Sequence, residues 1–410
     1  MTLAQSSKRS LIFKKESSWG VAAGASGAQV IRRVQSTLGL TKANYQSAEK
    51  RADFQKADSR HGIRRIQGGL NGELYLGAWE LMLAALCRRD FAANSTITAD
   101  TGDGFTYVAS TGVVTRAAGA GESFITDGAR VGMVVRPSGF HASLDSRNFV
   151  LTAVTATTLT WAAIDGGTLG SDVSTPDTNA QLAIPGKSTY VPLTGHTSDS
   201  FTIEDYESAL DISEAYRGVV FGGAQIQVPA TGIATIDYNS LLGKDLDIAS
   251  AGSAPYFSSP TAAGVQRALA STPGYMRFNG AQVAVATSIS LTLDLGIEGP
   301  DVAFAETVPA VLYGPAIMVS GQASIFVTDQ SYLTAFKEET EMEMNLILQA
   351  PGSQPRDFLN LYMPRVKINS ATRDDPDRGI QQTINFEALL KGNTTGYEST
   401  TLFIQDSSLV

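Results

Sequence analysis

The sequence predicts a mainly β protein with two tandem β modules, each with a short helix, and a small all-β module inserted into the first. The 39 glycines and 15 prolines among 410 residues imply many turns, which favours short strands over long helices. An octapeptide in the middle of the chain recurs near its end, and a long internal stretch has a composition of its own. Single cores rarely extend past roughly 250–300 residues, so a chain of this length is expected to contain more than one module.

The first module begins with a strand, a loop, a second strand and a helix. Residues 28–40 predict a strand, and residues 41–62 predict a long exposed loop because they are polar and lack apolar periodicity. Residues 63–76 alternate in polarity and predict the second strand. A short helix follows, since its large apolar residues are spaced at i, i+3, i+4 and i+7. These residues are Trp79, Met82, Leu83 and Leu86.

The composition changes at about residue 92. From Phe91 to Gly186 the chain contains no lysine, while Thr, Ala, Gly and Ser dominate. Segments such as 106–116 and 148–161 read as short strands joined by tight turns. We therefore interpret residues 93–186 as an inserted all-β module of barrel or sandwich type.

An internal repeat indicates that the rest of the chain is a duplication. Residues 235–242 read TIDYNSLL and residues 383–390 read TINFEALL. Each octapeptide follows a strand of alternating type, at 224–228 in one copy and at 365–369 in the other. Weaker counterparts keep the same order upstream, which a chance match does not readily produce. They pair the strand 63–76 with 315–327, the helix at 79–90 with 329–339, and the strand 28–40 with 281–296.

These observations divide the chain into three parts. The first module is discontinuous and comprises residues 1–92 and 187–250, the insert comprises 93–186, and the second module comprises 251–410. The boundary between the two modules falls in a segment rich in Ser, Ala, Pro and Gly near 248–275. Each module then has about 160 residues, a usual domain size.

Few residues suit catalysis or metal binding. The single cysteine, Cys87, excludes an intramolecular disulfide framework and lies in an apolar helix, so we expect it to be buried. No nucleophile elbow and no phosphate-binding loop occur. The segment from Asp100 to Asp103 resembles a fragment of a calcium loop but lacks the later bidentate Glu, so a turn is expected. We predict a protein that is not an enzyme and that needs no cofactor or metal.

The sequence also contains no predicted membrane segment. Its longest apolar stretch, near 79–87, is about half of the ~20 residues that a spanning helix needs. The basic N-terminal segment has no apolar core of the kind found in secretory signals, so a protein made and used in the cytoplasm is expected.

Charge is unevenly distributed along the chain. Residues 1–66 carry a local balance of +9, which leaves −18 for the remainder of a chain whose net charge is −9. Such asymmetry is typical of a nucleic-acid-binding arm or of copies that meet end to end, and an ordinary solvated surface also produces it. The basic loop 51–65 could contact several phosphates, but Asp53 and Asp58 interrupt it and Phe54 is its one aromatic residue.

The sequence therefore favours self-assembly over tight nucleic-acid binding. An open sheet leaves unpaired edges, and neighbouring copies can close it into a ring. Head-to-tail contacts of complementary charge would then stack rings into a filament, because a heterologous association does not terminate.

Five segments of the chain share a pattern with a known family. They are KESSWGV at 15–21, VIRRVQSTLGL at 30–40, NYQSAEKRADFQ at 44–55, the segment 63–86 and the segment 216–245. These segments resemble the tail tube proteins of long-tailed, non-contractile bacteriophages, which are the siphophage major tail proteins. The resemblance covers most of 15–90 and 187–247 and extends more faintly over 276–391.

The resemblance implies two tandem β-sandwich tail-tube modules in a two-module variant of the family. In that family, stacked rings enclose a channel through which DNA passes, and the inner sheet of each module joins those of its neighbours. Single-module members form six-membered rings, so a fused pair implies a trimeric ring with pseudo-sixfold symmetry. The implied location is the virion tail after synthesis in the host cytoplasm. The implied partners are other copies of the chain and the tail terminator, tape-measure and distal tail proteins.

The resemblance also implies two groups of assembly residues. The loop 41–62 would reach the adjacent ring, and the long charged turn at 370–379 would be a solvated tip or a protein contact. The candidate ring-stacking residues are Arg51, Asp53, Lys56, Asp58, Arg60, Asp374, Asp375, Asp377 and Arg378. The candidate lumen-facing residues, at outward-alternating positions of the hairpin strands, are Asp237, Asn239, Asn385 and Glu387. An acidic lining would keep DNA mobile because it neutralises no phosphates; the alternative is that these positions face solvent or a neighbouring sheet.

Two other functions remain open at this stage. The insert 93–186 is expected on the outer surface, where a β-rich tail component or adhesin would use it to bind the host surface. An enzyme that cleaves polysaccharides would need paired carboxylates in a cleft, which no local spacing in the sequence indicates.

Overall fold

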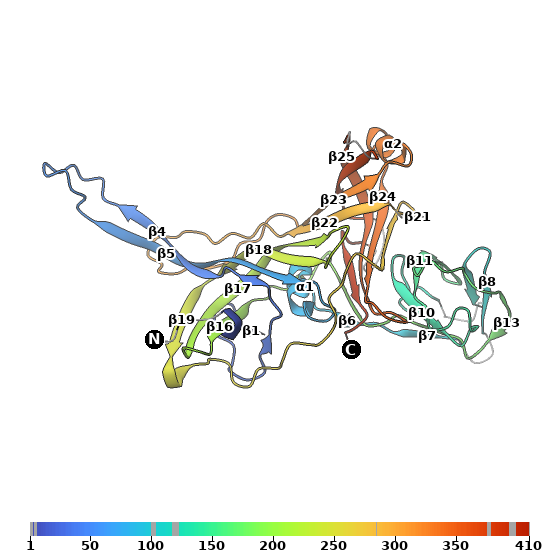
Figure 1. Cartoon of the computed structure of the whole chain (residues 1–410), viewed down its shortest axis with the longest axis horizontal. Coiled ribbons are helices and arrows are strands. Elements are labelled where there is room, and N and C mark those ends of the chain that lie inside the picture. The colour runs from blue at the N-terminus through green and yellow to red at the C-terminus, as the bar shows by residue number, and fades with distance from the viewer. Residues whose placement is uncertain are drawn as a thin grey trace.

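The computed structural model describes residues 3, 6–99, 104–116, 123–283, 285–374, 379–392 and 399–409. Strands dominate the described chain, and their pairings form one 19-stranded sheet and one eight-stranded sheet. Figure 1 shows an elongated molecule with a hairpin projecting at one end and the eight-stranded sheet at the other. The predicted mainly β fold class is confirmed.

The elements follow the chain in four groups. The first comprises η1 (Ser6–Lys8), β1 (Arg9–Lys15), β2 (Gln29–Val30), β3 (Gln35–Ser36), β4 (Gly39–Gln46), β5 (Ser59–Glu73), α1 (Glu80–Cys87) and β6 (Ala92–Ala93). The second comprises β7 (Thr96–Thr98), β8 (Phe105–Val108), β9 (Val113–Arg116), β10 (Val134–Ser138), β11 (Phe149–Val154), β12 (Thr158–Ala163), β13 (Val173–Asp177) and β14 (Gln181–Ala183). The third comprises β15 (Lys187–Tyr190), β16 (Phe201–Glu207), β17 (Ile212–Val228), β18 (Thr235–Gly243), β19 (Asp245–Ser250) and η2 (Ala251–Ser253). The fourth comprises β20 (Gly274–Phe278), β21 (Ala281–Gln282), β22 (Ala286–Asp294), β23 (Met318–Phe326), α2 (Ser331–Lys337), β24 (Met342–Gln349), β25 (Phe358–Arg373), β26 (Gln381–Ala388) and β27 (Phe403–Asp406).

The centre of the large sheet consists of two four-strand groups with the same connectivity. In the first group β4 pairs with β5, β5 with β18, and β18 with β17. In the second group β22 pairs with β23, β23 with β26, and β26 with β25. Pairing of β17 with β22 joins the groups into one array, which we call the eight-strand array. A helix follows β5 in one group and β23 in the other, which is the order that the internal repeat predicts.

The pairing register aligns the two groups residue by residue. Gln227 of β17 lies opposite the first residue of the first octapeptide, and Thr372 of β25 lies opposite the first residue of the second. By this register, residues 224–228 correspond to 369–373. The predicted strand at 365–369 is confirmed as part of β25, which continues to Arg373.

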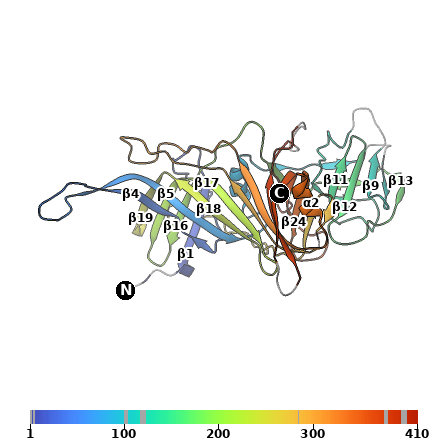
Figure 2. The same cartoon turned by 90° about the horizontal axis from the view of Figure 1, so that it is seen from above.

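Strands β4 and β5 form a long hairpin that leaves the body of the molecule (Figures 1 and 2). The predicted loop 41–62 is therefore wrong in its flanks, because β4 reaches Gln46, β5 begins at Ser59, and only residues 47–58 lie between them. Almost every residue of β4 is exposed, so the strand lacks the alternating apolar pattern that would reveal it in the sequence. The predicted strand at 28–40 is likewise divided between β2, β3 and the start of β4.

Helix α1 forms where the apolar spacing predicts it and packs its large side chains into the core. Met82, Leu86 and Cys87 are fully buried there. Burial raises the pKa of the Cys87 thiol to about 12, so this cysteine behaves as a small apolar residue and not as a nucleophile. The second helix, α2, lies within the predicted region 329–339.

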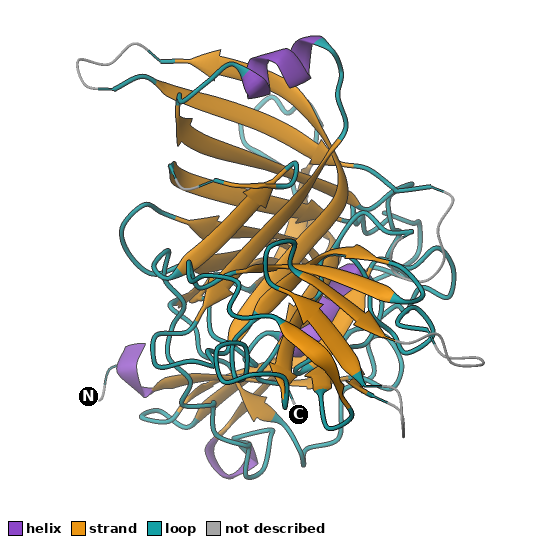
Figure 3. Cartoon of the chain, turned by 90° about the vertical axis from the view of Figure 1, so that its right-hand side faces the viewer, coloured by secondary structure: helices purple, strands orange, loops and turns teal. Residues whose placement is uncertain are grey.

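One hydrophobic core underlies both strand groups. Leu70, Ile226, Leu291 and Ile384 come from four strands of the eight-strand array and belong to the same buried cluster. Seen from the side, the strands of the large sheet lie stacked with α2 at one end (Figure 3). The smaller sheet has a second buried cluster, rich in aromatic residues that include Trp161.

The N-terminal segment is fixed to the large sheet by a buried carboxylate. Glu16 accepts hydrogen bonds from the backbone N–H groups of Gly20 and Gly218, both at 2.8 Å. It also accepts from Ser200 Oγ at 2.7 Å and from Thr202 Oγ1 at 2.8 Å. Because four donors converge on one buried side chain, Glu16 ties the first strand region to β16 and β17.

Candidate assembly surfaces

The candidate surfaces are two sheet edges, one polar sheet face, the projecting loops and the attachment of the insert. Within the described residues, no three His, Cys, Asp or Glu side chains come together as potential metal ligands. None of the helices in the same residues is long and apolar enough to cross a bilayer.

The eight-strand array has an unpaired edge on each side within the described residues. On the first side, β3 and β4 pair with β5 alone. On the second side, β24 pairs with β25 only as far as Val366, and residues 367–373 have β26 as their one strand neighbour. The equivalent edge of β17 is occupied by β22. Each free edge offers backbone N–H and C=O groups to a further strand.

Polar side chains line one face of this array from edge to edge. Residues opposite each other in an antiparallel sheet point to the same face, so a row can be followed from strand to strand. One row runs through Gln35, Asn71, Asp237, Gln225, Thr292, Ser320, Glu387 and Lys367. Most of these side chains end in an uncharged amide or hydroxyl, so the face is polar with few charges.

The four candidate lumen-facing residues all lie on this polar face. Asp237 and Asn239 alternate with buried residues of β18, and Asn385 and Glu387 alternate with buried residues of β26. The Asn385 amide donates to Ser370 Oγ at 2.7 Å, and its Oδ1 accepts from Gln322 Nε2 at 2.9 Å. Residues about 150 positions apart in the chain therefore share one face of the array, although β17, β22 and β23 lie between their strands.

The charged candidates of the hairpin cluster around its tip, where all are exposed. Arg51 forms an ion pair with Asp53 at 2.8 Å, and Arg60 forms one with Asp58 at 3.3 Å. The hydrogen bonds from Arg51 lower the pKa of the Asp53 carboxyl. Lys56 Nζ donates to Gln46 Oε1 at 2.5 Å. The tip therefore partly neutralises its own charges, and the exposed pairs stabilise it only weakly.

The remaining charged candidates belong to the opposite end of the array. β5 begins at the hairpin and ends at Glu73, which lies opposite Thr235. We call this second end the turn end, because the turns between β17 and β18 and between β25 and β26 lie there. Asp374 follows β25 at the turn end, and its N–H donates to the Gln381 carbonyl at 2.9 Å. Asp375, Asp377 and Arg378 lie outside the described residues.

The second strand group has a long loop of its own, which the sequence analysis did not identify. Residues 295–317 connect β22 to β23, as the hairpin tip connects β4 to β5 in the first group. The loop lies against the hairpin strand β5, where Arg64 N–H donates to the Glu306 carbonyl at 2.9 Å and Arg65 pairs with Asp301. The two repeats are only weakly similar around this loop, so the sequence did not predict it.

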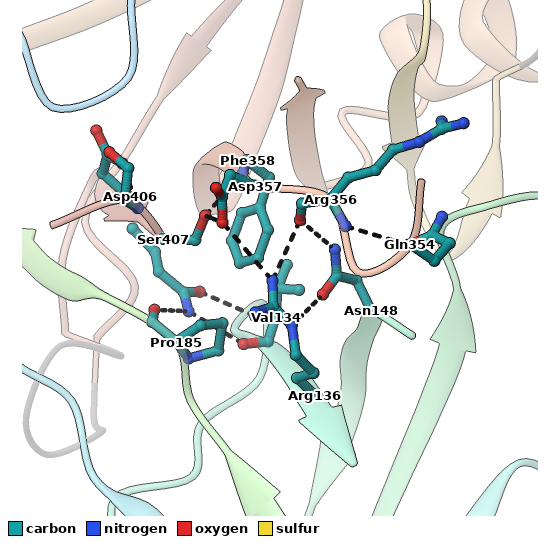
Figure 4. Close-up of polar contacts among 12 residues, drawn as sticks. Val134, Arg136, Asn148, Pro185, Gln354, Arg356, Asp357, Phe358, Asp406 and Ser407 are labelled. Carbon is teal, nitrogen blue, oxygen red and sulfur yellow. Dashed lines mark hydrogen bonds and ion pairs between the residues drawn. The ribbon is translucent and has the colours of Figure 1, made fainter. Parts of the chain in front are cut away.

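The insert is attached to the large sheet by side-chain amides and not by a flexible linker alone. The side-chain amide of Gln405 in β27 accepts a hydrogen bond from the Val134 N–H at 2.9 Å and donates one to the Val134 carbonyl at 3.0 Å. This pair of hydrogen bonds resembles the pair that two backbones form in a β-sheet. Gln405 also donates to the Pro185 carbonyl at 3.1 Å. Figure 4 shows this contact together with the bonds that Arg136 and Asn148 donate to the Arg356 carbonyl. The insert is therefore held in one orientation.

The comparison with protein families gives one match. A family model described as phage tail tube protein matches residues 6–388 of the chain. No curated protein matches the chain.

Proposed function

Because the chain belongs to the phage tail tube protein family, we propose that it polymerises into stacked trimeric rings that form the tube of a non-contractile tail. The family is a structural one and not an enzyme family. Its members self-polymerise and associate with other tail proteins in the tail of the virion. DNA would pass through the tube without being tightly bound.

The observation that carries the proposal is the pair of free edges on the eight-strand array. Inside the chain, β17 pairs with β22, with Gln227 opposite Ser290. In the aligned groups Gln227 corresponds to Thr372. Ser290 of β22 and Gln35 of β3 also correspond to each other, because they lie opposite equivalent residues of β23 and β5. The same junction between copies would therefore place Thr372 of one chain opposite Gln35 of the next.

Repeating this junction closes a ring. Each chain supplies two equivalent four-strand groups, so three chains supply six groups in a continuous barrel. Closure in this way leaves no free edge on the eight-strand array, which protects these strands from uncontrolled edge pairing. We also propose the division of the chain into a first module (1–92 and 187–250), an insert (93–186) and a second module (251–410).

Electron microscopy of the purified protein tests this function. We expect hollow, regularly striated tubes whose cross-section has threefold symmetry with six similar inner lobes. Analytical ultracentrifugation at low concentration should detect a trimer as the unit that assembles. Compact particles that remain monomeric at high concentration would contradict the proposal.

In the proposed tube the polar face of the array lines the channel. Its amide and hydroxyl groups can hydrate the wall without neutralising phosphates, so they add little affinity for DNA. The carboxylates of Asp237 and Glu387 would add a weak repulsion of the duplex. The lining is thus less acidic than the charge balance of the chain suggests.

Cysteine labelling tests this orientation. In Asn239→Cys, a bulky thiol reagent should label the unassembled protein readily and assembled tubes only slowly, because the side chain would face a narrow lumen. Glu338→Cys, an exposed position at the end of α2 on the core side of the sheet, is the matched control and should stay reactive in tubes. Cys87 is buried and should not react in either state. Equal protection of both positions, or of neither, would show that the polar face does not line the channel.

The remaining assignments follow from this arrangement. The hairpin tip with Arg51, Asp53, Lys56, Asp58 and Arg60 would reach the adjacent ring, where the turn end with Asp374 would meet it. The insert would lie on the outer surface, because the contacts of its described residues are with β25, β27 and their neighbours and not with the polar face. Tail terminator, tape-measure and distal tail proteins would be the other partners, and the chain would be made in the host cytoplasm.

A further inference from the structure

Each of the two projecting loops exposes one phenylalanine to solvent. Phe54 at the hairpin tip is 99% exposed, and Phe304 in the loop 295–317 is fully exposed. Both have left-handed backbone conformations, with φ of 59° and 66°. A bulky residue rarely adopts this region, so the two loops share an uncommon conformation at an exposed aromatic residue.

The two phenylalanines lie in corresponding connections of the two strand groups. Phe54 lies between β4 and β5, and Phe304 lies between β22 and β23 in the loop that packs against β5. Each is held in place by its neighbours: Phe54 N–H donates to the Arg51 carbonyl at 3.3 Å, while Asp301 and Glu306 fix the backbone around Phe304 to β5. The exposure is therefore a property of the folded loops.

A hollow of mixed polarity lies at the opposite, turn end of the array. It has a volume of about 310 Å³, and apolar side chains such as Val228, Met276 and Ile289 line it together with polar residues such as Thr272 and Gln282. Val228 ends β17 beside the start of β22, at the end where β5 terminates. The hollow thus lies at the junction of the two strand groups.

A second hollow lies at the equivalent place in the first group. Its volume is about 760 Å³, and its lining combines Leu11, Val30, Val34 and Tyr75 with the charged residues Arg9, Arg32, Arg33 and Glu73. In the first hollow one wall comes from the end of β17, the strand that precedes the junction. The corresponding wall of the second hollow would come from the end of β25 of a neighbouring copy, so this hollow is complete only in the ring.

We propose that Phe54 and Phe304 are paired apolar anchors that seat in the two turn-end hollows of copies in the next ring. The inference rests on the proposed tube. It matches two anchors with two hollows per chain and places them at opposite ends of the array, which is the geometry of open-ended head-to-tail stacking. Buried aromatic side chains dominate interface energetics, whereas exposed ion pairs such as those of the hairpin tip contribute little.

Removal of the anchors tests the proposal. The double variant Phe54→Ala, Phe304→Ala should still form trimeric rings, but the protein concentration needed for tubes should rise by about tenfold or more. Val108→Ala is the control, because Val108 is an exposed apolar residue of the insert and lies in neither loop and in the lining of neither hollow. This control should assemble like the unaltered protein, as measured by sedimentation and negative-stain microscopy.

A variant of the hollow gives an independent measurement. Ala286 contributes to the lining of the first hollow and is exposed, so Ala286→Trp should fill it and weaken stacking while rings persist. Tubes at unaltered concentrations in both the double variant and Ala286→Trp would overturn the anchors and leave the tube function standing. Absence of rings and tubes in the unaltered protein would instead overturn the proposed function and this inference with it.

Discussion

A chain that carries Gln35→Cys and Thr372→Cys is expected to become covalently linked into closed trimers under mild oxidation. The two positions lie on opposite free edges of the array, too far apart to bond within one chain, and the proposed junction sets them face to face between copies. Opposite residues of an antiparallel pair have Cβ atoms about 4.5–5.5 Å apart, close to the spacing that a disulfide requires. Both positions are exposed, so neither substitution disturbs the core.

The chain offers matched controls for this experiment. Gln227→Cys with Ser290→Cys reproduces the same junction inside one molecule and should give an intramolecular disulfide. Thr37→Cys with Thr372→Cys keeps the same face but shifts the register by two residues, so linking should be much slower. Cys87 does not compete, because it is buried and the pKa of its thiol is raised to about 12. Non-reducing electrophoresis separates the products. Faster linking in the shifted pair than in the matched pair would contradict the proposed register.

Glu16→Gln is expected to destabilise the folded chain by about 2–4 kcal/mol. The carboxylate accepts four hydrogen bonds in a buried site. A glutamine side chain has one carbonyl oxygen and one NH₂ group. The NH₂ group would face hydrogen-bond donors and could not accept hydrogen bonds from them. The N-terminal segment should then loosen from β16 and β17.

Denaturant unfolding of the unassembled protein measures this effect. Glu49→Gln is the control, since Glu49 lies exposed in the hairpin tip and its substitution should change the free energy of unfolding by less than about 0.5 kcal/mol. Equal stability of the two variants would show that the carboxylate of Glu16 is not needed to hold this region.

The sequence predicted those parts of the fold whose pattern is local. The spacing from Trp79 to Leu86 revealed α1, and the octapeptides revealed the duplication, because buried positions impose a period on nearby residues. The sequence pattern did not predict β4, because the residues on both faces of this strand are exposed to solvent. Alternation alone was enough to bring Asp237, Asn239, Asn385 and Glu387 to one face.

Features that depend on distant contacts had no comparable signal. Gln405 holds the insert through Val134, a residue more than 250 positions away, and nothing near Gln405 in the sequence marks it. The charged tip residues were predicted as the stacking contacts, yet the structure pairs two of the arginines with neighbouring carboxylates. Phe54 was noted only as a lone aromatic, because its equivalence to Phe304 depends on the spatial alignment of the two groups.

Strand β27 has a consequence for the order in which the nascent protein matures. It pairs with β15 and β25, and its Gln405 reaches into the insert. The ribosome produces residues 403–406 after the other strands described above, so the insert cannot be fixed in its final orientation until this segment has been translated. Truncated chains that lack β27 would leave β15 and the first half of β25 without this neighbour. Prematurely ended chains would therefore lack the shape of a complete subunit, and few of them could enter a growing polymer.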